Sequence, residues 1–231
     1  MRSAFFGLAV AIAAMTAEAD IVARAAQCGR TDRPDARPVR HGIHRRSGVD
    51  VAHFACIWSP PFMPSVTVVE YHDTLHDRYF MTADRAEQAA IDAGSAAPQW
   101  ARTGYTFVAD LYADGCGTLA PVYRFTGVPD IGPASHFFTS STTECALVRD
   151  RADRQWMFEG VAFGALPFAD GCPDGVPPAL MSRKTVALYR AYNNGAGGTP
   201  NHRFSIERAV IDAMVAQGWT DEGAVMCVYA P

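Results

Sequence analysis

Short runs of alternating apolar and polar residues recur along this chain, separated by segments rich in Gly, Pro, Asn and Asp. Runs that mix β-branched and aromatic residues lie at 67–71 (TVVEY), 121–125 (PVYRF) and 186–190 (VALYR), and this composition is typical of β-strands. A turn-rich stretch follows each run, and then a second strand-like segment, at 78–82 (RYFMT), 136–140 (HFFTS) and 202–206 (HRFSI). The pattern therefore predicts two strands joined by a turn at three places.

A helical segment is predicted after each pair of strands. Capping-box spacing relates Asp84 to Glu87 in the first segment and Ser141 to Glu144 in the second, so we expect these residues to begin helices. In the third segment Ser205 is the predicted cap.

The ends of two helices are also marked in the sequence. Gly94 and Gly218 follow the first and third helical runs, and glycine commonly terminates helices because it adopts a positive φ at little cost. We therefore predict that these two helices end there.

Three tryptophans mark a third strand in each case. Trp100, Trp156 and Trp219 each precede a glycine by four residues, and strand-like residues follow. The glycine is expected to form the turn through which the strand leaves. The tryptophans are expected to be core anchors, since each can bury up to about 250 Å²; stacking on a ligand is the less favoured reading.

The order strand, strand, helix, strand thus occurs three times, in units at about 67–112, 121–168 and 186–229. No such unit can bury both of its faces alone, so the three are expected to pack together. We predict an α+β fold in which three repeats form one disulfide-braced, β-rich domain over 51–231, with pseudo-threefold symmetry as one possible arrangement.

The N-terminal region has the features of an exported protein. Residues 1–19 combine an early Arg, an apolar run over 5–15 and the sequence Ala-Glu-Ala at 17–19, as a secretory signal peptide does. The run is shorter than the roughly 20 apolar residues that span a bilayer, so a membrane anchor is disfavoured. Residues 20–50 form an Arg-rich arm or linker. We expect a secreted or periplasmic protein with no transmembrane segment after signal cleavage.

Composition and motifs exclude several classes of function. Hydrophobic residues make up 49% of the chain, charged residues 19%, and the formal net charge is −4. Global disorder is thereby excluded, and no nucleic-acid partner is expected, because such binding needs an electropositive face. The sequence contains no P-loop, G-x-G-x-x-G or G-x-S-x-G motif. We expect no cofactor, and a monomer.

The six cysteines predict disulfides rather than a metal site. An even number in an exported chain indicates three bridges, and six cysteines allow 15 pairings, among which sequence alone does not choose. We favour Cys28–Cys56, Cys116–Cys145 and Cys172–Cys227. No C-x-x-C is present, and His72 and His76 fall in a turn without a third ligand at motif spacing, so no metal is predicted.

One polar group recurs in two of the predicted units. Its members are Arg124, His136 and Glu159 in the second unit, and Arg190, His202 and Glu222 in the third. The first unit has Glu70, Arg78 and Thr103 in these places. Such a group can form a polar pocket for a sugar or a carboxylate. It can also form a structural network that locks a strand to the turn after each Trp. Repetition favours the structural network, because a device of the fold must recur and a catalytic site need not.

The three units resemble the bacterial extracytoplasmic repeats known as DUF5648, a domain of unknown function. The segments that carry the resemblance lie within 67–229, above all ALYRAYNNGAGGTPNHRFS and MVAQGWTDEGAVMCV in the last unit. The resemblance implies an accessory or binding role and supplies no catalytic residues. The chain departs from the family at Arg78, where His is common, and at Ser205-Ile206, where Thr-Thr is common.

Three functional hypotheses follow. The first is a secreted or periplasmic non-catalytic binding or accessory module for a glycan or other cell-envelope component. The second is a small extracytoplasmic hydrolase with Glu159, Glu222 and His136 or His202 as acid and base. The third is a purely structural spacer.

Overall fold

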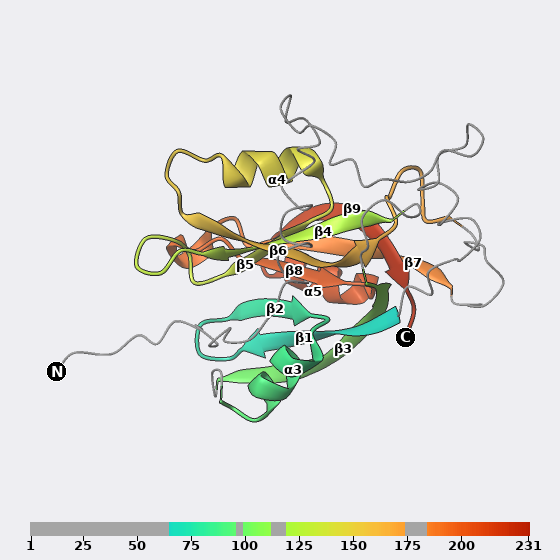
Figure 1. Ribbon diagram of the computed structural model, residues 1–231, viewed down its shortest axis with the longest axis horizontal. Helices are drawn as coiled ribbons and strands as arrows, with labels where there is room; N and C mark the ends of the chain where they lie inside the picture. Colours follow the sequence, from blue (N-terminus) through green and yellow to red (C-terminus); the bar gives the residue numbers. More distant parts are fainter. Residues whose placement is uncertain (1–64, 96–98, 112–118, 174–183) are drawn as a thin grey trace, which may run out of the picture.

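The computed structural model describes residues 65–95, 99–111, 119–173 and 184–231. These residues form a β-rich α+β domain with a nine-stranded antiparallel sheet and three α-helices (Figure 1). The predicted signal peptide, the Arg-rich arm and the proposed Cys28–Cys56 bridge lie outside the described residues. In the described part of the chain, no helix is both long and apolar enough to cross a membrane.

The elements follow one another in three stretches, each with a hairpin, a helix and a long strand. The first stretch contains β1 (Ser65–Asp73), β2 (Arg78–Thr82), α3 (Arg85–Asp92) and β3 (Trp100–Asp110). The second contains β4 (Ala120–Gly127), β5 (His136–Thr139), α4 (Thr142–Arg149) and β6 (Trp156–Ala165). The third contains β7 (Thr185–Tyr192), the short 3₁₀ helix η1 (Ala196–Gly198), β8 (His202–Ser205), α5 (Arg208–Ala216) and β9 (Thr220–Tyr229).

Strand pairing has the same plan in each stretch. The first strand lies between the short second strand and the long third strand and pairs antiparallel with both. The long strands β3, β6 and β9 then meet one another near their C-terminal ends, through the residue pairs Asp110 with Gly164, Val108 with Tyr229, and Leu166 with Cys227. These three contacts join the stretches into one sheet.

The main hydrophobic core draws on all three stretches. Its buried members include Val68 and Phe107 from the first, Val122 and Phe163 from the second, and Leu188 and Met226 from the third. Two smaller clusters contain residues of α4 and α5 together with residues of the neighbouring strands. In Figure 1, α4 lies in the upper part of the view, α3 lies at the bottom, and α5 lies between them.

The first two helices begin as the sequence predicts. The Asp84 carboxylate accepts hydrogen bonds from the backbone N–H groups of Ala86 and Glu87, and the Ser141 hydroxyl accepts one from Glu144. Each cap satisfies N–H groups that have no partner within the helix.

The third helix begins differently from the prediction. Its N-cap is Glu207, which makes no side-chain capping bond. Ser205 lies two residues earlier, and its hydroxyl accepts a hydrogen bond from the Glu207 N–H at 3.0 Å. The first and third helices end as predicted, before Gly94 and Gly218, whose φ values are 66° and 94°.

A disulfide joins Cys172, in the segment after β6, to Cys227 in β9, with the two Cα atoms 5.6 Å apart. This is the pair predicted from the sequence, and it ties the second stretch to the third. Cys145 on α4 is also disulfide-bonded, but its predicted partner Cys116 lies outside the described residues.

Candidate functional site

The predicted polar residues gather where a β-bulge interrupts the long third strand. The pairing of β4 with β6 shifts register on both sides of Arg124, which lies opposite Gly160. The pairing of β7 with β9 shifts in the same way around Arg190, opposite Gly223.

This geometry corrects the predicted role of the glycine after each Trp. Gly223 lies inside β9 rather than in a turn before a strand, and Gly160 lies inside β6. Their φ values are 77° and 128°. Residues with a Cβ disfavour these values, whereas glycine adopts them at little cost. A bulge re-aims the neighbouring side chain, and in both strands that neighbour is a glutamate.

The structure brings each predicted trio together. Nε of Arg124 lies 2.9 Å from Oε2 of Glu159, and Nε2 of His136 lies 4.0 Å from the same oxygen. In the third stretch, Arg190 Nε lies 2.7 Å from Glu222 Oε2, and His202 Nε2 lies 3.6 Å from it.

Each arginine has a second carboxylate partner that the sequence analysis missed. Glu87 on α3 accepts a 2.9 Å bond from Arg124 Nη1. Glu144 on α4 accepts bonds of 3.1 and 2.8 Å from Nη1 and Nη2 of Arg190. From the sequence, these two glutamates were predicted only to take part in helix capping. Each pairs with an arginine from the next stretch of the chain, and no sequence pattern near either glutamate predicts this pairing.

In the first stretch a glutamate takes the place of the arginine, and its partner is an arginine of the third stretch. Glu70 accepts bonds of 3.1 and 3.0 Å from Nε and Nη2 of Arg203 in β8. Thr103 donates its hydroxyl to the Glu70 carbonyl at 3.3 Å. Arg78 does not join this cluster, because its guanidinium donates to the carbonyls of His76 and Asp77.

The predicted alignment of Arg78 with the two histidines is wrong by one residue. In the three hairpins, Glu70 faces Met81, Arg124 faces Phe138, and Arg190 faces Phe204. Two residues before each facing position stand Tyr79, His136 and His202. Strand register, which the sequence pattern does not fix, thus gives the histidine position to Tyr79.

Burial controls the charge of the two histidines. The side chains of His136 and His202 are 15% and 10% exposed. Burial, together with the adjacent guanidinium of Arg124 or Arg190, lowers the pKa of each histidine to about 3. Both rings are therefore neutral at pH 7. A pKa this far from neutrality makes a histidine a poor general base, since effective catalytic groups titrate near the working pH.

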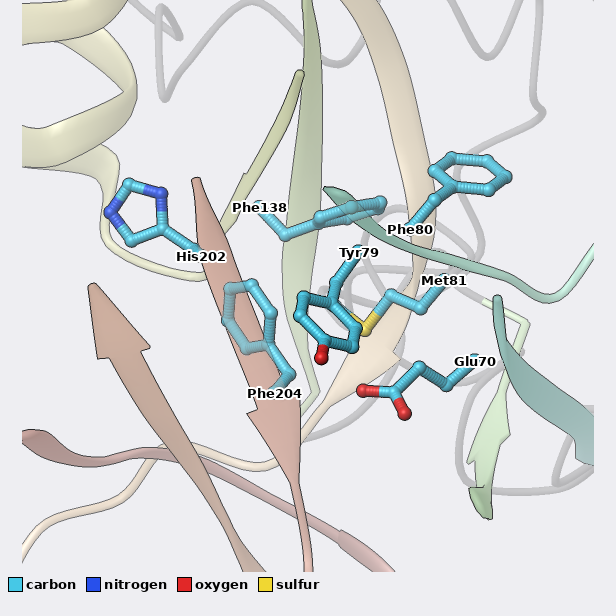
Figure 2. Close-up of a pocket in the computed structure, with 7 residues that line it drawn as sticks. All are labelled: Glu70, Tyr79, Phe80, Met81, Phe138, His202 and Phe204. Carbon is cyan, nitrogen blue, oxygen red and sulfur yellow. The ribbon is translucent and has the colours of Figure 1, made fainter. Parts of the chain in front are cut away.

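The cavity beside this cluster is too small for a ligand. Its volume is about 10 Å³, enough for about one water molecule and far below the hundreds of Å³ of a small-molecule pocket. Figure 2 shows Tyr79, Met81, Phe138 and Phe204 converging on it, while the ring of His202 lies apart from these four.

The model of one family, described as a domain of unknown function (DUF5648), matches residues 60–166 and 175–229. The chain belongs to this family. No curated protein and no solved structure matches the chain. Membership of the DUF5648 family identifies the domain and assigns it no activity.

The tryptophans of this DUF5648 domain lie at the edges of its hydrophobic clusters. Trp100, Trp156 and Trp219 are half-buried, and each packs against a different cluster. Their nearest aromatic partners are Phe80 at 6.0 Å, Phe137 at 6.3 Å and Tyr79 at 6.2 Å between ring centroids. These contacts fit anchoring of the strand ends.

Of the two histidines predicted to fall in a turn, His76 does so but His72 lies in β1, and both bond to neighbouring carboxylates. His72 Nε2 lies 2.8 Å from Asp77, and His76 Nδ1 lies 2.8 Å from Asp73. Within the residues that the structure describes, no group of three or more His, Cys, Asp or Glu side chains is arranged to hold a metal.

Proposed function

We propose that this DUF5648 domain is a non-catalytic accessory module, secreted or periplasmic, that binds a glycan or other cell-envelope component through its surface. We also propose that its three stretches are copies of one repeat unit arranged around a pseudo-threefold axis. One observation carries both proposals: the histidines that a hydrolase would use pack against the preceding stretch, and its glutamates pair with the arginines that reach that stretch.

Two of these contacts have matching geometry. Arg124 of the second stretch pairs with Glu87 of the first and lies 5.6 Å above the ring of Phe80. Arg190 of the third stretch pairs with Glu144 of the second and lies 5.4 Å above Phe137. Each arginine thus reaches the helix and the short strand of the preceding stretch.

The histidine positions also contact the preceding stretch. The ring of His136 lies 4.4 Å from that of Phe80, and the ring of His202 lies 5.0 Å from that of Phe137. In the first stretch, Tyr79 takes this place and lies 4.3 Å from the guanidinium of Arg203 in the third stretch. The chain of contacts therefore closes into a ring.

The contact between the first and third stretches, Glu70 with Arg203, has its charges reversed relative to the other two: the first strand supplies the carboxylate and the preceding stretch supplies the arginine. Glu70 stands where the other stretches have arginine, and Arg203 stands where they have Phe80 and Phe137. The helix position three residues after the N-cap, glutamate in α3 and α4, is the buried Val210 in α5. Arg124, Arg190 and Arg203 thus each pair with at least one carboxylate, and each glutamate in these contacts pairs with an arginine.

These ion pairs hold the fold too firmly to serve a reaction. The side chains of Arg190 and Glu70 are 7% and 8% exposed. Removing one member of a buried pair leaves an uncompensated charge at a cost of roughly 3–5 kcal/mol. Groups under this constraint are poorly placed to exchange partners during catalysis, which supports a non-catalytic role.

Two further observations support a location outside the cytoplasm. Residues 1–19 have the pattern of a signal peptide. The disulfide between Cys172 and Cys227 belongs to a class of bond that persists mainly in oxidising compartments.

The proposal is tested by a glycan array read together with unfolding measurements on His136→Gln and His202→Gln. Stability should fall in both variants while binding by the folded fraction is retained. Binding lost without loss of stability would instead make the trio the ligand site, and a complete absence of binding would favour a spacer. Turnover of a glycan or peptide library that Glu159→Gln abolishes would make the protein a hydrolase.

A further inference from the structure

An open groove of about 740 Å³ lies beside the start of β6 and shares no residue with the small cavity lined by Tyr79 and Phe204. Its volume is in the range of small-molecule sites. Its polar lining is Arg149, Asp150, Arg151 and Arg154, and its apolar lining includes Val128, Trp156 and Met157.

Three arginines line this groove, and two of them use only part of their N–H donors in hydrogen bonds. Arg149 binds Asp150 through Nε at 2.7 Å and Nη2 at 2.8 Å. Arg151 binds Asp153 through Nε and Nη2 in the same manner. Within the described residues, Nη1 of neither arginine makes a hydrogen bond, so each retains two N–H donors.

Arg154 has no evident structural role in the part of the chain that the structure describes. Its side chain is exposed and makes no ion pair or hydrogen bond within the described part of the chain. Its φ is 50°, and the other described non-glycine residues with positive φ are Asp or Asn, which tolerate this conformation. Such a conformation strains an ordinary residue and tends to persist at functional positions. Arg149, in contrast, is accounted for by the C-terminal end of α4, which favours a positive charge.

Apolar groups form the rest of the surface. Met157 is 49% exposed, and the half-buried Trp156 is fixed from behind by Phe137. An indole and aliphatic carbons suit the C–H faces of a sugar ring, while guanidinium N–H groups suit a carboxylate.

The groove is held in shape by the loop between β4 and β5. The Val128 N–H donates to the Gln155 carbonyl at 2.9 Å. Gly132 packs so closely that a Cβ there would lie 2.0 Å from the same carbonyl oxygen. The loop therefore lies directly against the chain that leads into β6, and little rearrangement is needed before a ligand binds.

We propose that this groove binds an acidic saccharide, with the carboxylate of a uronic-acid unit on the arginine donors and the sugar face against Trp156 and Met157. The inference rests on the proposed role as an exported binding module and adds the site and the ligand class. Charge favours it, because three guanidinium groups face two paired carboxylates here although the whole chain has a formal net charge of −4.

The test is calorimetric titration of the folded protein with oligogalacturonate, and with neutral dextran as comparison, in low and high salt. Oligogalacturonate should bind, and binding should weaken as salt screens the charges. Arg154→Gln should weaken it about tenfold, whereas Arg85→Gln, an equal change at an exposed arginine on α3, should leave it unchanged. Met157→Glu should abolish it, and Leu147→Glu, at a 66% exposed position outside the groove, should not.

Several results would overturn this assignment. They are an absence of oligogalacturonate binding, equal binding of dextran, and an Arg154→Gln variant that binds like the parent. Binding of duplex DNA or phosphatidylglycerol vesicles in place of oligogalacturonate, with the same dependence on Arg154, would also overturn it. Shortening of the oligosaccharide during the titration, followed by chromatography, would instead overturn the non-catalytic role, so the two failures are distinguishable.

Discussion

Acidification should destabilise this domain through His136 and His202, well above the pH at which carboxylates protonate. Both histidines have a pKa of about 3 in the folded protein against an ordinary value of 6.5, because they are buried beside arginine. In the unfolded chain they take up protons as the pH falls below about 6.5. Their contribution to stability is therefore present above pH 6.5 and is lost progressively as the pH falls towards 3.

The size of the effect follows from these two pKa values. Between pH 7 and pH 5, one histidine that stays neutral in the fold and titrates normally when unfolded costs about 2 kcal/mol, and two cost about 4 kcal/mol. Burial raises the pKa of Glu159, so this carboxylate takes up its proton more readily in the folded state and works in the opposite direction. A comparison between variants at the same two pH values separates the terms.

The assay is urea unfolding at pH 7 and pH 5 of the parent and of the His136→Gln/His202→Gln double variant. The parent should lose about 4 kcal/mol more than the double variant on acidification. His76→Gln, at a side chain that is 49% exposed, should behave like the parent. An equal pH dependence in the parent and the double variant would refute the view that both histidines are held neutral by burial.

Three further outcomes test the ring of ion pairs and the bulges. Glu144→Gln should cost about 1.5–3 kcal/mol in urea unfolding because it removes one of the two carboxylates that pair with the buried Arg190, while Asp212→Asn, at a 60% exposed side chain, should change stability by less than about 0.5 kcal/mol. Glu70→Arg and Arg203→Glu should each destabilise by at least about 3 kcal/mol, and the double exchange should recover part of the loss in a double-mutant cycle. Gly223→Ala should lower stability by about 1–2 kcal/mol, because alanine is strained at a φ of 77°; an unchanged unfolding midpoint would count against the bulge.

The sequence predicted local features well because local chemistry determines them. The β-branched and aromatic runs did become strands, and Asp84 and Ser141 did cap helices, because each depends on residues within one turn or one strand. The approach of Arg124 to Glu159 was also within reach, since the pattern places the two on the first and third strands of one unit, and these strands pair.

Features that depend on pairing between distant segments were missed or misread. A glycine at positive φ fits a turn as well as a bulge, and only the register of β7 on β9 shows that Gly223 is in a bulge. The one-residue slip that aligned Arg78 with the histidines has the same origin. The pairing of Glu87 with Arg124 joins residues 37 positions apart, and the capping pattern gave that glutamate another role.

The exchanged charges at the closing contact carry a consequence for specificity. Three identical contacts would let any stretch follow any other, so a stretch from a second copy of the chain could complete the ring as a swapped domain. Here the first stretch presents Glu70, which matches Arg203, while the other two present Arg124 and Arg190. Either of these arginines beside Arg203 would place like charges together in a buried site, at a cost of several kcal/mol. The exchange therefore favours one neighbour for each stretch and disfavours the wrong ones, as specific interfaces do. Specificity of this kind is a reason to retain buried ion pairs, since well-packed apolar residues often stabilise a fold as well as an ion pair does.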